Sequence, residues 1–516
     1  MRALALLLLT TACIEGEGTN PFGAGLLQDK PSMTNGGEAW PARAEDDWQA
    51  PTPLRTFYVA PGGDDEAPGN ADEPWGDLQT ALCRLRSGDR LVLRAGEYKG
   101  PIAIDGDCVS ADGRGPIEVV GEPGANIVSG PAPVSDGLGF WNPILLLNRG
   151  GWQLRNLVID GADYGGIGLQ VLERGSRSEL RDIVIKEASY ASLSVGPNVR
   201  ELEATNIVMR HGQYVDGNVT HGLLLLGGCA AITLRNSFIH HNSGDGVQIW
   251  GPHVLPVDLG TVPNVIASRN LLFEGNEIHD NQGHGIVVGS SAEVTIKRNR
   301  LWNGRPSPVG EGRAIEIHDL VVGVSVEENL IVESTEGIAV GAGERPEAHP
   351  DGPRPPQDVW IARNYISNPL QPGRYGILVD TATDVRIYHN AIETVRKGLF
   401  IKDLPPKTQG LRILNNLILE ASEVGFRVSG MAAVDRFDFN AFSLGATDVL
   451  GEINGERSTI ASLVENGEMP NTQAVNQVSI GVDLRSVEGV EVVDRGTPIP
   501  GLNYEGAAPD LGPAEQ

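Results

Sequence analysis

Aromatic side chains, cysteines and long apolar runs are all scarce in this chain. Phe, Trp and Tyr together make up 5% of its 516 residues, and four cysteines stand against 66 glycines. No stretch after the first 13 residues is apolar enough to cross a bilayer, so no membrane-spanning helix is expected there. The composition instead favours many short strands joined by tight turns, with few long helices.

Basic residues are in deficit as well. The chain carries 40 Lys and Arg against 67 Asp and Glu, a formal net charge of −27 at pH 7. This charge repels phosphate backbones, so no nucleic acid is expected as a partner. It would also repel a uronate polymer unless a local basic or cation-loaded groove overrode it. The net charge therefore favours solubility and identifies no substrate.

The N-terminal residues have the charge and the apolar core of an export signal. An apolar run at 3–9 follows Met1 and Arg2, and the small residues before Cys13 resemble a bacterial lipoprotein signal, in which this cysteine is lipidated. Thr10 departs from the usual Leu, so secretion without a lipid stays open. Residues 14–53 lack periodicity and suit a flexible tether. We expect an exported protein, either an outer-membrane or cell-surface lipoprotein held to the membrane through its lipid alone, or a secreted protein.

Export to an oxidising compartment guides the interpretation of the remaining cysteines. Cys83 and Cys108 are 25 residues apart and are predicted to form a disulfide, the alternative being two buried free thiols. Cys229 lies in the apolar stretch 226–232, which predicts a buried, inert thiol.

A repeat of regular length runs through most of the chain. An Asn or Asp followed by a short aliphatic triplet recurs at gaps that cluster at 23–26 residues, and longer gaps indicate inserted loops. The positions are Asn156, Asp182, Asn206, Asn236, Asn276, Asn299, Asn329, Asn364, Asn390, Asn416 and Asn440. One unit holds three short strands, so the repeat predicts one coil of a solenoid. Stacked turns about 4.8 Å apart would let each side chain bond to the next, so we predict one structural ladder from Asn156 to Asn440.

The start of the repeat region resembles the entry segment of a known family. The segments are FYVAPGGD at 57–64, PWGDLQTAL at 74–82 and SGDRLVLRAGEY at 87–98. They are similar to segments of the right-handed parallel β-helix proteins of the pectate-lyase-like superfamily, and residues 504–512 resemble the usual end of such proteins. The resemblance implies an all-β right-handed parallel β-helix whose N-terminal end is plugged by a helix around 78–85. Because the family contains lyases, hydrolases, epimerases and non-catalytic members, it leaves the chemistry open.

The resulting organisation is a single monomeric solenoid. We expect a signal at 1–13, a tether at 14–53, an N-terminal cap with the first rungs at 54–135, β-helix repeats at 136–445 and an end segment at 446–516.

Histidines gather in one part of the repeat, since eight of the ten lie between residues 211 and 318. Inserted loops at 213–220, 251–265, 304–312 and 341–357 are predicted to wall one sheet face. The positions just before successive Gly-led strands are His221, Asp245, His284, Arg313 and Glu336. Outward positions on those strands include Gln248, Trp250, Glu316, His318 and Asp380. The turn triplets at 240–242 and 279–281 are assigned a structural role.

This polar face could supply the groups that lysis of a uronic-acid polymer needs. His284 and His318 would move protons and Arg313 would neutralise the substrate carboxylate. Calcium would be held by Asp245 and Glu316. The polysaccharide would also contact His221, Gln248, Trp250 and Glu336. Hydrolysis by two carboxylates and non-catalytic glycan binding or adhesion at a cell surface stay open as alternatives.

Overall fold

The computed structural model describes residues 52–513, with gaps at 112–114, 131–142, 162–165, 214–218, 250–266, 305–310, 319, 342–354, 369–372, 403–407, 430–433, 444–449, 454–455, 466–468, 470, 476–478, 481–486, 489–494, 501 and 503–507. The chain divides into two units, Met1–Trp48 and Gln49–Gln516. The first unit, with Cys13 and most of the predicted tether, lies outside the described residues. So do Trp250 and the larger part of each predicted wall loop.

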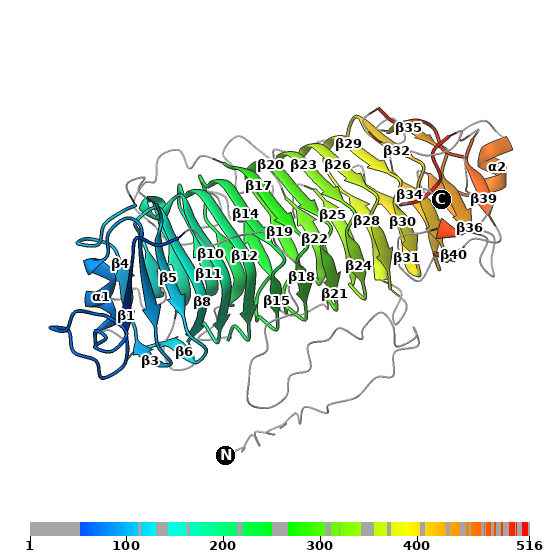
Figure 1. The fold of residues 1–516 in the computed structure, drawn as a ribbon. Coiled ribbons are helices and arrows are strands. Elements are labelled where there is room, and N and C mark those ends of the chain that lie inside the picture. The colour runs from blue at the N-terminus through cyan, green and yellow to red at the C-terminus, as the bar shows by residue number, and fades with distance from the viewer. Residues whose placement is uncertain are drawn as a thin grey trace, which may run out of the picture. The chain divides into compact units, whose positions relative to one another are not determined.

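The second unit is a right-handed parallel β-helix, as the repeat and the resemblance predict. Each coil contributes up to three short strands, which pair in parallel with the equivalent strands of the neighbouring coils. Figure 1 shows the strands stacked between α1 (Leu78–Arg84) at one end and α2 (Ile460–Glu465) at the other. A short 3₁₀ turn, Glu173–Gly175, lies early in the stack.

The three strands of a coil form three columns, of which the first two belong to one 25-stranded sheet. The first column contains β1 (Arg55–Val59), β2 (Asp89–Leu93), β5 (Ile117–Gly121), β8 (Trp152–Asp160), β10 (Ser178–Lys186), β12 (Arg200–Arg210), β14 (Ala230–Arg235), β17 (Ser268–Glu274), β20 (Ser291–Lys297), β23 (Val322–Glu327), β26 (Gln357–Ala362), β29 (Thr383–Tyr388), β32 (Leu411–Leu414) and β35 (Val434–Asp438). The second column contains β3 (Gly96–Lys99), β6 (Ala125–Val128), the later halves of β8, β10 and β12, and then β15 (Phe238–His240), β18 (Glu277–His279), β21 (Arg300–Trp302), β24 (Leu330–Val332), β27 (Tyr365–Ser367), β30 (Ala391–Glu393), β33 (Leu417–Leu419), β36 (Ala441–Ser443) and β39 (Gln473–Val475).

The third column is a separate 14-stranded sheet. It contains β4 (Ile102–Ile104), β7 (Pro143–Leu147), β9 (Ile167–Val171), β11 (Ala191–Val195), β13 (His221–Leu225), β16 (Val247–Ile249), β19 (Ile286–Val288), β22 (Arg313–Ile317), β25 (Glu336–Val340), β28 (Gly373–Val379), β31 (Val395–Ile401), β34 (Val424–Val428), β37 (Leu450–Ile453) and the antiparallel β38 (Glu456–Thr459). A small hairpin, β40 (Ser479–Ile480) with β41 (Val487–Glu488), follows in the chain.

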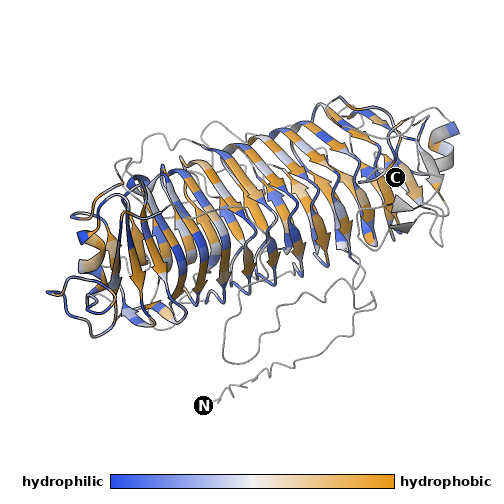
Figure 2. Ribbon diagram, in the orientation of Figure 1, coloured by the Kyte–Doolittle hydropathy of each residue, from blue (hydrophilic) through white to orange (hydrophobic). Residues whose placement is uncertain are grey.

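The core fills the interior of the coils because apolar and polar residues alternate along each strand. In β22, Ile315 and Ile317 are buried inside while Glu316 between them points outward. Figure 2 shows this alternation as orange and blue bands along the arrows. One contiguous apolar cluster extends from Val59 in β1 to Met469.

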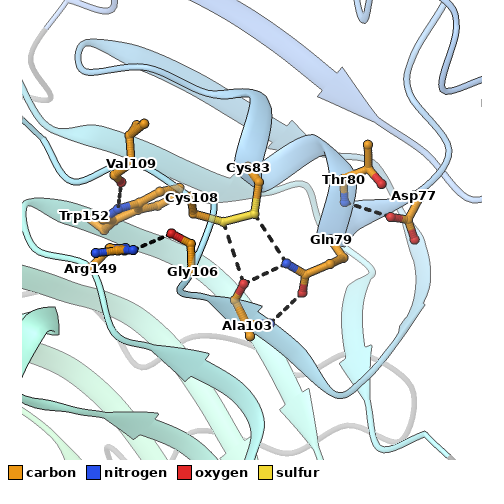
Figure 3. The surroundings of a disulfide bond; sticks show 10 residues. All are labelled: Asp77, Gln79, Thr80, Cys83, Ala103, Gly106, Cys108, Val109, Arg149 and Trp152. Carbon is orange, nitrogen blue, oxygen red and sulfur yellow. Dashed lines mark hydrogen bonds between the residues drawn. A yellow bond between two sulfur atoms is a disulfide. The ribbon is translucent and has the colours of Figure 1, made fainter.

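The N-terminal end of the solenoid is covered by α1, as the resemblance implies. Asp77 caps this helix by accepting from the backbone N–H of Thr80 at 2.7 Å, and Leu78 and Leu82 are buried in the core. Cys83 on α1 and Cys108 form a disulfide, with their Cα atoms 4.0 Å apart (Figure 3). The disulfide therefore joins the cap to the chain just after β4.

The asparagine ladder differs in extent from the prediction. From Asn276 to Asn440, each side-chain amide donates to the next Oδ1 at 2.9–3.0 Å, and every member of this series is buried. Asn156, Asp182, Asn206 and Asn236 do not belong to this column. They lie one position earlier in the turn, in register with Gly275, and adopt left-handed backbone with φ of 50–57°. The prediction that these four belong to the ladder is wrong, because Asn favours both the ladder position and the left-handed position. Within their own row, the amide of Asn206 does donate to Oδ1 of Asp182 at 2.6 Å.

None of the helices in the described part of the chain is long and apolar enough to cross a membrane. Cys229 is a free, fully buried thiol, and burial raises its pKa to about 12. This thiol is therefore unreactive near neutral pH.

Candidate functional site

Five polar residues form one row across the third column, which we call the charged column: His221, Asp245, His284, Arg313 and Glu336. Arg313 is paired in register with Glu336. The register Val247 to Ile286 to Ile315 places Asp245, His284 and Arg313 two residues before these core positions on successive rungs. The spacing in the sequence therefore gives the correct register for this face.

Asp245 lies between His221 and His284. Its Oδ2 is 3.3 Å from Nδ1 of His221, and its Oδ1 accepts from the backbone N–H of His284 at 2.6 Å. Burial alone would raise the pKa of Asp245, but the hydrogen bond and charge of His221 and the neighbouring His284 outweigh it and lower that pKa. Asp245 is therefore a fixed carboxylate at neutral pH.

The tautomer of His284 follows from its neighbours. Its Nδ1 lies 3.2 Å from the backbone nitrogen of Arg313, which can only donate, so Nδ1 accepts. The proton of the neutral ring is then on Nε2, which lies 3.2 Å from Oε2 of Glu316. Glu316 thus receives the N–H of His284 and orients this ring.

Glu316 also contacts His318 and Arg313. Its Oε1 is 3.5 Å from Nε2 of His318, whose side chain is 33% exposed. The same Oε1 accepts from Nη1 of Arg313. One buried carboxylate therefore binds two imidazoles and one guanidinium.

Arg313 is enclosed by three carboxylates. Its Nε donates to Glu336 at 2.7 Å, its Nη1 to Glu316 and its Nη2 to Glu311. Burial alone would lower the pKa of Arg313, but the charges of Glu316, Glu336 and Glu311 outweigh burial, so the pKa is raised above its usual value. Because these three nitrogens donate to protein carboxylates, Arg313 stabilises the buried negative charges of the site. The predicted role of Arg313 in neutralising a substrate carboxylate would require it to exchange one of these partners.

Two residues of this site escaped the sequence analysis. Glu311 is 44% exposed and pairs with Arg313, and Arg374 is 52% exposed and reaches back one rung to Glu336 at 3.7 Å. The register between Glu336 and Tyr375 was the signal for Arg374, but the long insertion before β28 hid it. Gln248 lies on β16 with its side chain outward, in register with Val287 and Glu316.

Calcium does not fit the two carboxylates predicted to bind it. Asp245 is bonded to His221 and His284, and Glu316 to Arg313, so their oxygens face cationic or donor groups. Among the described residues, the groups of three metal-binding side chains with ligand atoms close together lie elsewhere, around His241.

A shallow pocket lies beside the charged column at the corner between the second and third columns. His284 and Arg313 line one part of it, and His279, Asp280 and Trp302 from the second column line another. The turns at this corner are held by Asn242 and Asn281, whose side chains bond to each other at 2.9 Å. Within the turn triplets, these asparagines carry the structural role that was expected.

Comparison with known proteins agrees with the fold. A sequence model of the right-handed beta helix region matches residues 142–350, which include the whole charged column. Pectate lyase Pel9A is 14% identical over 90% of this chain and 97% of that one, with a TM-score of 0.45. The PL6 family alginate lyase AlyGC is 12% identical over 84% of this chain and 56% of that one, with a TM-score of 0.45.

PfbA, a surface adhesin of Streptococcus pneumoniae, is 12% identical over 72% of this chain and 91% of that one, with a TM-score of 0.41. A search of curated protein sequences gave no match. At these identities the three structures assign no activity to the chain. The matching sequence model and the strand pairing agree that this chain contains a right-handed parallel β-helix.

Proposed function

We propose that this protein processes a polysaccharide at the charged column and the adjoining Glu316 and His318 by imidazole-driven proton transfer, as in the lysis of an acidic glycan. The observation that carries the proposal is the arrangement of His284 and His318 on the single carboxylate of Glu316, at 3.2 and 3.5 Å. A carboxylate that orients an imidazole is a recurring device for general acid–base catalysis.

In this reaction His318, the more exposed ring, is the base. Neutral His318 takes the proton from the ring carbon next to the uronate carboxylate, and the released electron pair forms a carbon–carbon double bond as the glycosidic oxygen leaves. The imidazolium then returns the proton to that oxygen, so no water is consumed. Glu316 stabilises the imidazolium between these two steps.

Hydrolysis by two carboxylates fits the site less well, because it needs one carboxylic acid that stays protonated near neutral pH. Asp245 has a lowered pKa, and Glu316 and Glu336 each contact Arg313. The lowered pKa keeps Asp245 ionised, and Glu316 and Glu336 each accept a hydrogen bond from Arg313, so none of the three is positioned as a general acid.

Recognition of the glycan is assigned to the rungs after Glu336. Arg374 is half exposed and is a ready partner for a uronate carboxylate. Tyr375 and Lys397 continue the charged column in register, and Tyr375 stacks on Phe400 with ring centroids 5.0 Å apart. An aromatic ring beside cations suits a sugar ring that carries a carboxylate.

Glycan binding without turnover is the second candidate. The observation that favours it is the full pairing of Arg313 with protein carboxylates, which holds this side chain in place and leaves its charge already balanced. In that case the same face would serve as a recognition surface.

The test is incubation of the full chain with a panel of uronate polymers. We expect growing ultraviolet absorbance from unsaturated product, and we expect His318→Gln to lower the rate by about 10²-fold or more, the usual contribution of a general base. Arg374→Gln should raise KM more than it lowers kcat. Arg235→Gln is the matched control, because Arg235 is an exposed arginine on β14, in the first column and away from this face, that pairs with Glu274 at 3.1 Å.

The outcomes separate the candidates. Reducing sugar without ultraviolet absorbance would replace lysis with hydrolysis. Retention on a glycan column without any product would favour binding alone. Turnover by folded His318→Gln at the wild-type rate would reject the assigned base.

Export and lipid anchoring belong to the same proposal. Their support is the N-terminal signal pattern before Cys13, and the disulfide of Cys83 with Cys108 fits an oxidising compartment. Fatty-acid labelling of the expressed chain, compared with Cys13→Ser, tests the anchor. Unlabelled wild-type protein in the culture medium would favour secretion.

A further inference from the structure

A second group of titratable side chains lies outside the charged column, on two neighbouring rows of the second column. Arg210, His240, His279 and Trp302 are in register on successive rungs. The next residue of each rung adopts left-handed backbone, and there His211, His241, Asp280 and Asn303 follow one another with φ of 52–57°. The repeat therefore brings together residues that are 23–39 positions apart in the chain.

We call five of these residues the histidine cluster: His211, His240, His241, His279 and Asp280. Nδ1 of His240 and Nδ1 of His241 are 2.8 Å apart. The His211 ring lies edge-on to both, with centroids 5.9 and 5.6 Å away. His279 stacks on His240 at 4.9 Å and lies edge-on to His241 at 5.9 Å.

The ligand atoms of the histidine cluster lie close enough to share one ion. His211, His240 and His241 each offer a nitrogen within 4.8 Å of the others, and His241, His279 and Asp280 form a second such triad. Tetrahedral zinc with Zn–N bonds of about 2.1 Å separates its ligand atoms by about 3.4 Å. Spacings between 2.8 and 4.8 Å bracket that value, so small rotations of the rings bring three ligands to the metal.

Neighbouring groups orient this cluster as they do around bound metals. Nδ1 of His279 lies 2.6 Å from Oδ2 of Asp280, and Asp280 also accepts from the amide of Asn303. A carboxylate on one ring nitrogen fixes the tautomer and leaves the other nitrogen free to bind a metal. His279 is held in place from its other face by Trp302, with ring centroids 4.1 Å apart.

Packing gives no other reason for this gathering of imidazoles. The turns are already held by the amide bond between Asn242 and Asn281, and His211 and His241 are exposed, so neither ring fills the core. Placing several imidazoles in contact without an ion between them gains little, because each ring nitrogen could instead bond to water.

We propose that the histidine cluster binds one divalent transition-metal ion of the zinc type. Imidazole ligands with a single carboxylate select late first-row metals such as zinc, nickel and copper over calcium and magnesium. Because both triads contain His241, the cluster holds one ion and not two. The exposed faces of His211 and His241 leave a coordination position open to water or to a ligand. This site does not depend on the function proposed for the charged column.

The test is titration of the metal-free full chain with Zn²⁺ by calorimetry, with Co²⁺ absorption spectra to report the geometry. Two variants remove ligands and keep the local structure. His241→Asn keeps a residue that tolerates left-handed backbone, and His279→Phe keeps the ring stack on His240 and Trp302. Glu187→Asn is the matched control, because Glu187 is in register with His211 at the same left-handed position with φ of 56°.

We expect one zinc per chain and tetrahedral-type cobalt absorption. Each ligand variant should lose about 100-fold or more in affinity, since loss of a ligand exceeds the 10–100-fold cost of losing a supporting group. Glu187→Asn should bind as the wild type does. Absence of stoichiometric zinc binding by the wild type would overturn the proposal. So would folded His241→Asn and His279→Phe variants that bind zinc with the same affinity as the wild type.

Discussion

Replacing one ladder asparagine should destabilise the solenoid far more than replacing one of the left-handed residues that resemble it in sequence. Asn329 is buried, and its Oδ1 accepts from both the backbone N–H and the side-chain amide of Asn299 at 3.0 Å. Its Nδ2 donates to the carbonyl of Ile296 and to Oδ1 of Asn364, each at 2.9 Å. Asn329→Ala removes all four bonds.

The magnitude follows from the groups that are left without partners. Asn299 keeps its bond to the carbonyl of Phe273, but its backbone N–H and one amide N–H lose their acceptors in a buried turn. At about 1–3 kcal/mol for each stranded donor, the loss is about 3–4 kcal/mol. This equals about a 300-fold increase in the local opening equilibrium. Asn156→Ala should cost only about 1 kcal/mol, because Asn156 is exposed and only its left-handed backbone is strained by the change.

Hydrogen exchange measured by mass spectrometry is the suitable assay, because a solenoid is stabilised mainly by contacts between neighbouring rungs. Peptides that contain the turns at Asn299, Asn329 and Asn364 should lose protection, while those near β8 should not. In Asn156→Ala the turns of the ladder should keep their protection. Equal effects of the two variants, or full protection at Asn299 in Asn329→Ala, would refute the distinction between the two columns.

Three further predictions concern the ends of the solenoid and the charged column. Reduction of the disulfide between Cys83 and Cys108 should destabilise α1 by about 3.5 kcal/mol, the chain-entropy value for a loop of this length, and should leave the central rungs unchanged in hydrogen exchange. Burial lowers the pKa of His389 to about 4, so the unfolded chain binds this proton first and the unfolding free energy should fall by about 3 kcal/mol as the pH drops from about 6.5 to 4. Thermal unfolding of His389→Gln should lack this part of the pH dependence. Arg313→Ala should cost about 3–5 kcal/mol in chemical denaturation by leaving buried carboxylates without their cation, and a second change, Glu336→Gln, should recover part of that loss.

The length of one coil and the inward faces of its strands could be predicted, because both follow from the repeat length and the apolar alternation that the sequence shows directly. The ladder was misassigned over its first four positions because Asn suits two adjacent sites of the same turn. The apolar residues carried a signal that distinguishes them. After Asn156 the buried residues are Leu157 and Ile159, at the first and third positions, whereas after Asn276 the buried residue is Ile278, at the second. This shift of one residue marks the change of column.

Part of the candidate site could also be predicted from the period of the repeat. The register of Arg313 with Glu336 follows from counting between Gly-led strands, so the row of the charged column could be found. Side-chain partners do not follow from register alone, because Arg313 could extend toward solvent or toward its neighbours. The histidine cluster was hidden because gaps of unequal length separate His211, His241 and Asp280, which share one row only once the inserted loops are removed.

Glu316, beside the charged column, is a buried charge in a solenoid whose adjacent equivalent positions are apolar. Glu316 lies in an outward row whose adjacent members in register are Val287 and Ala339, and all three are buried. The fold therefore accepts apolar residues at this position. Buried ion pairs contribute little to stability compared with apolar residues of similar volume, and each depends on its partners being present. Since Glu316 binds two imidazoles and a guanidinium where its neighbours bind none, its place is better explained by the chemistry of those imidazoles than by the stability of the β-helix.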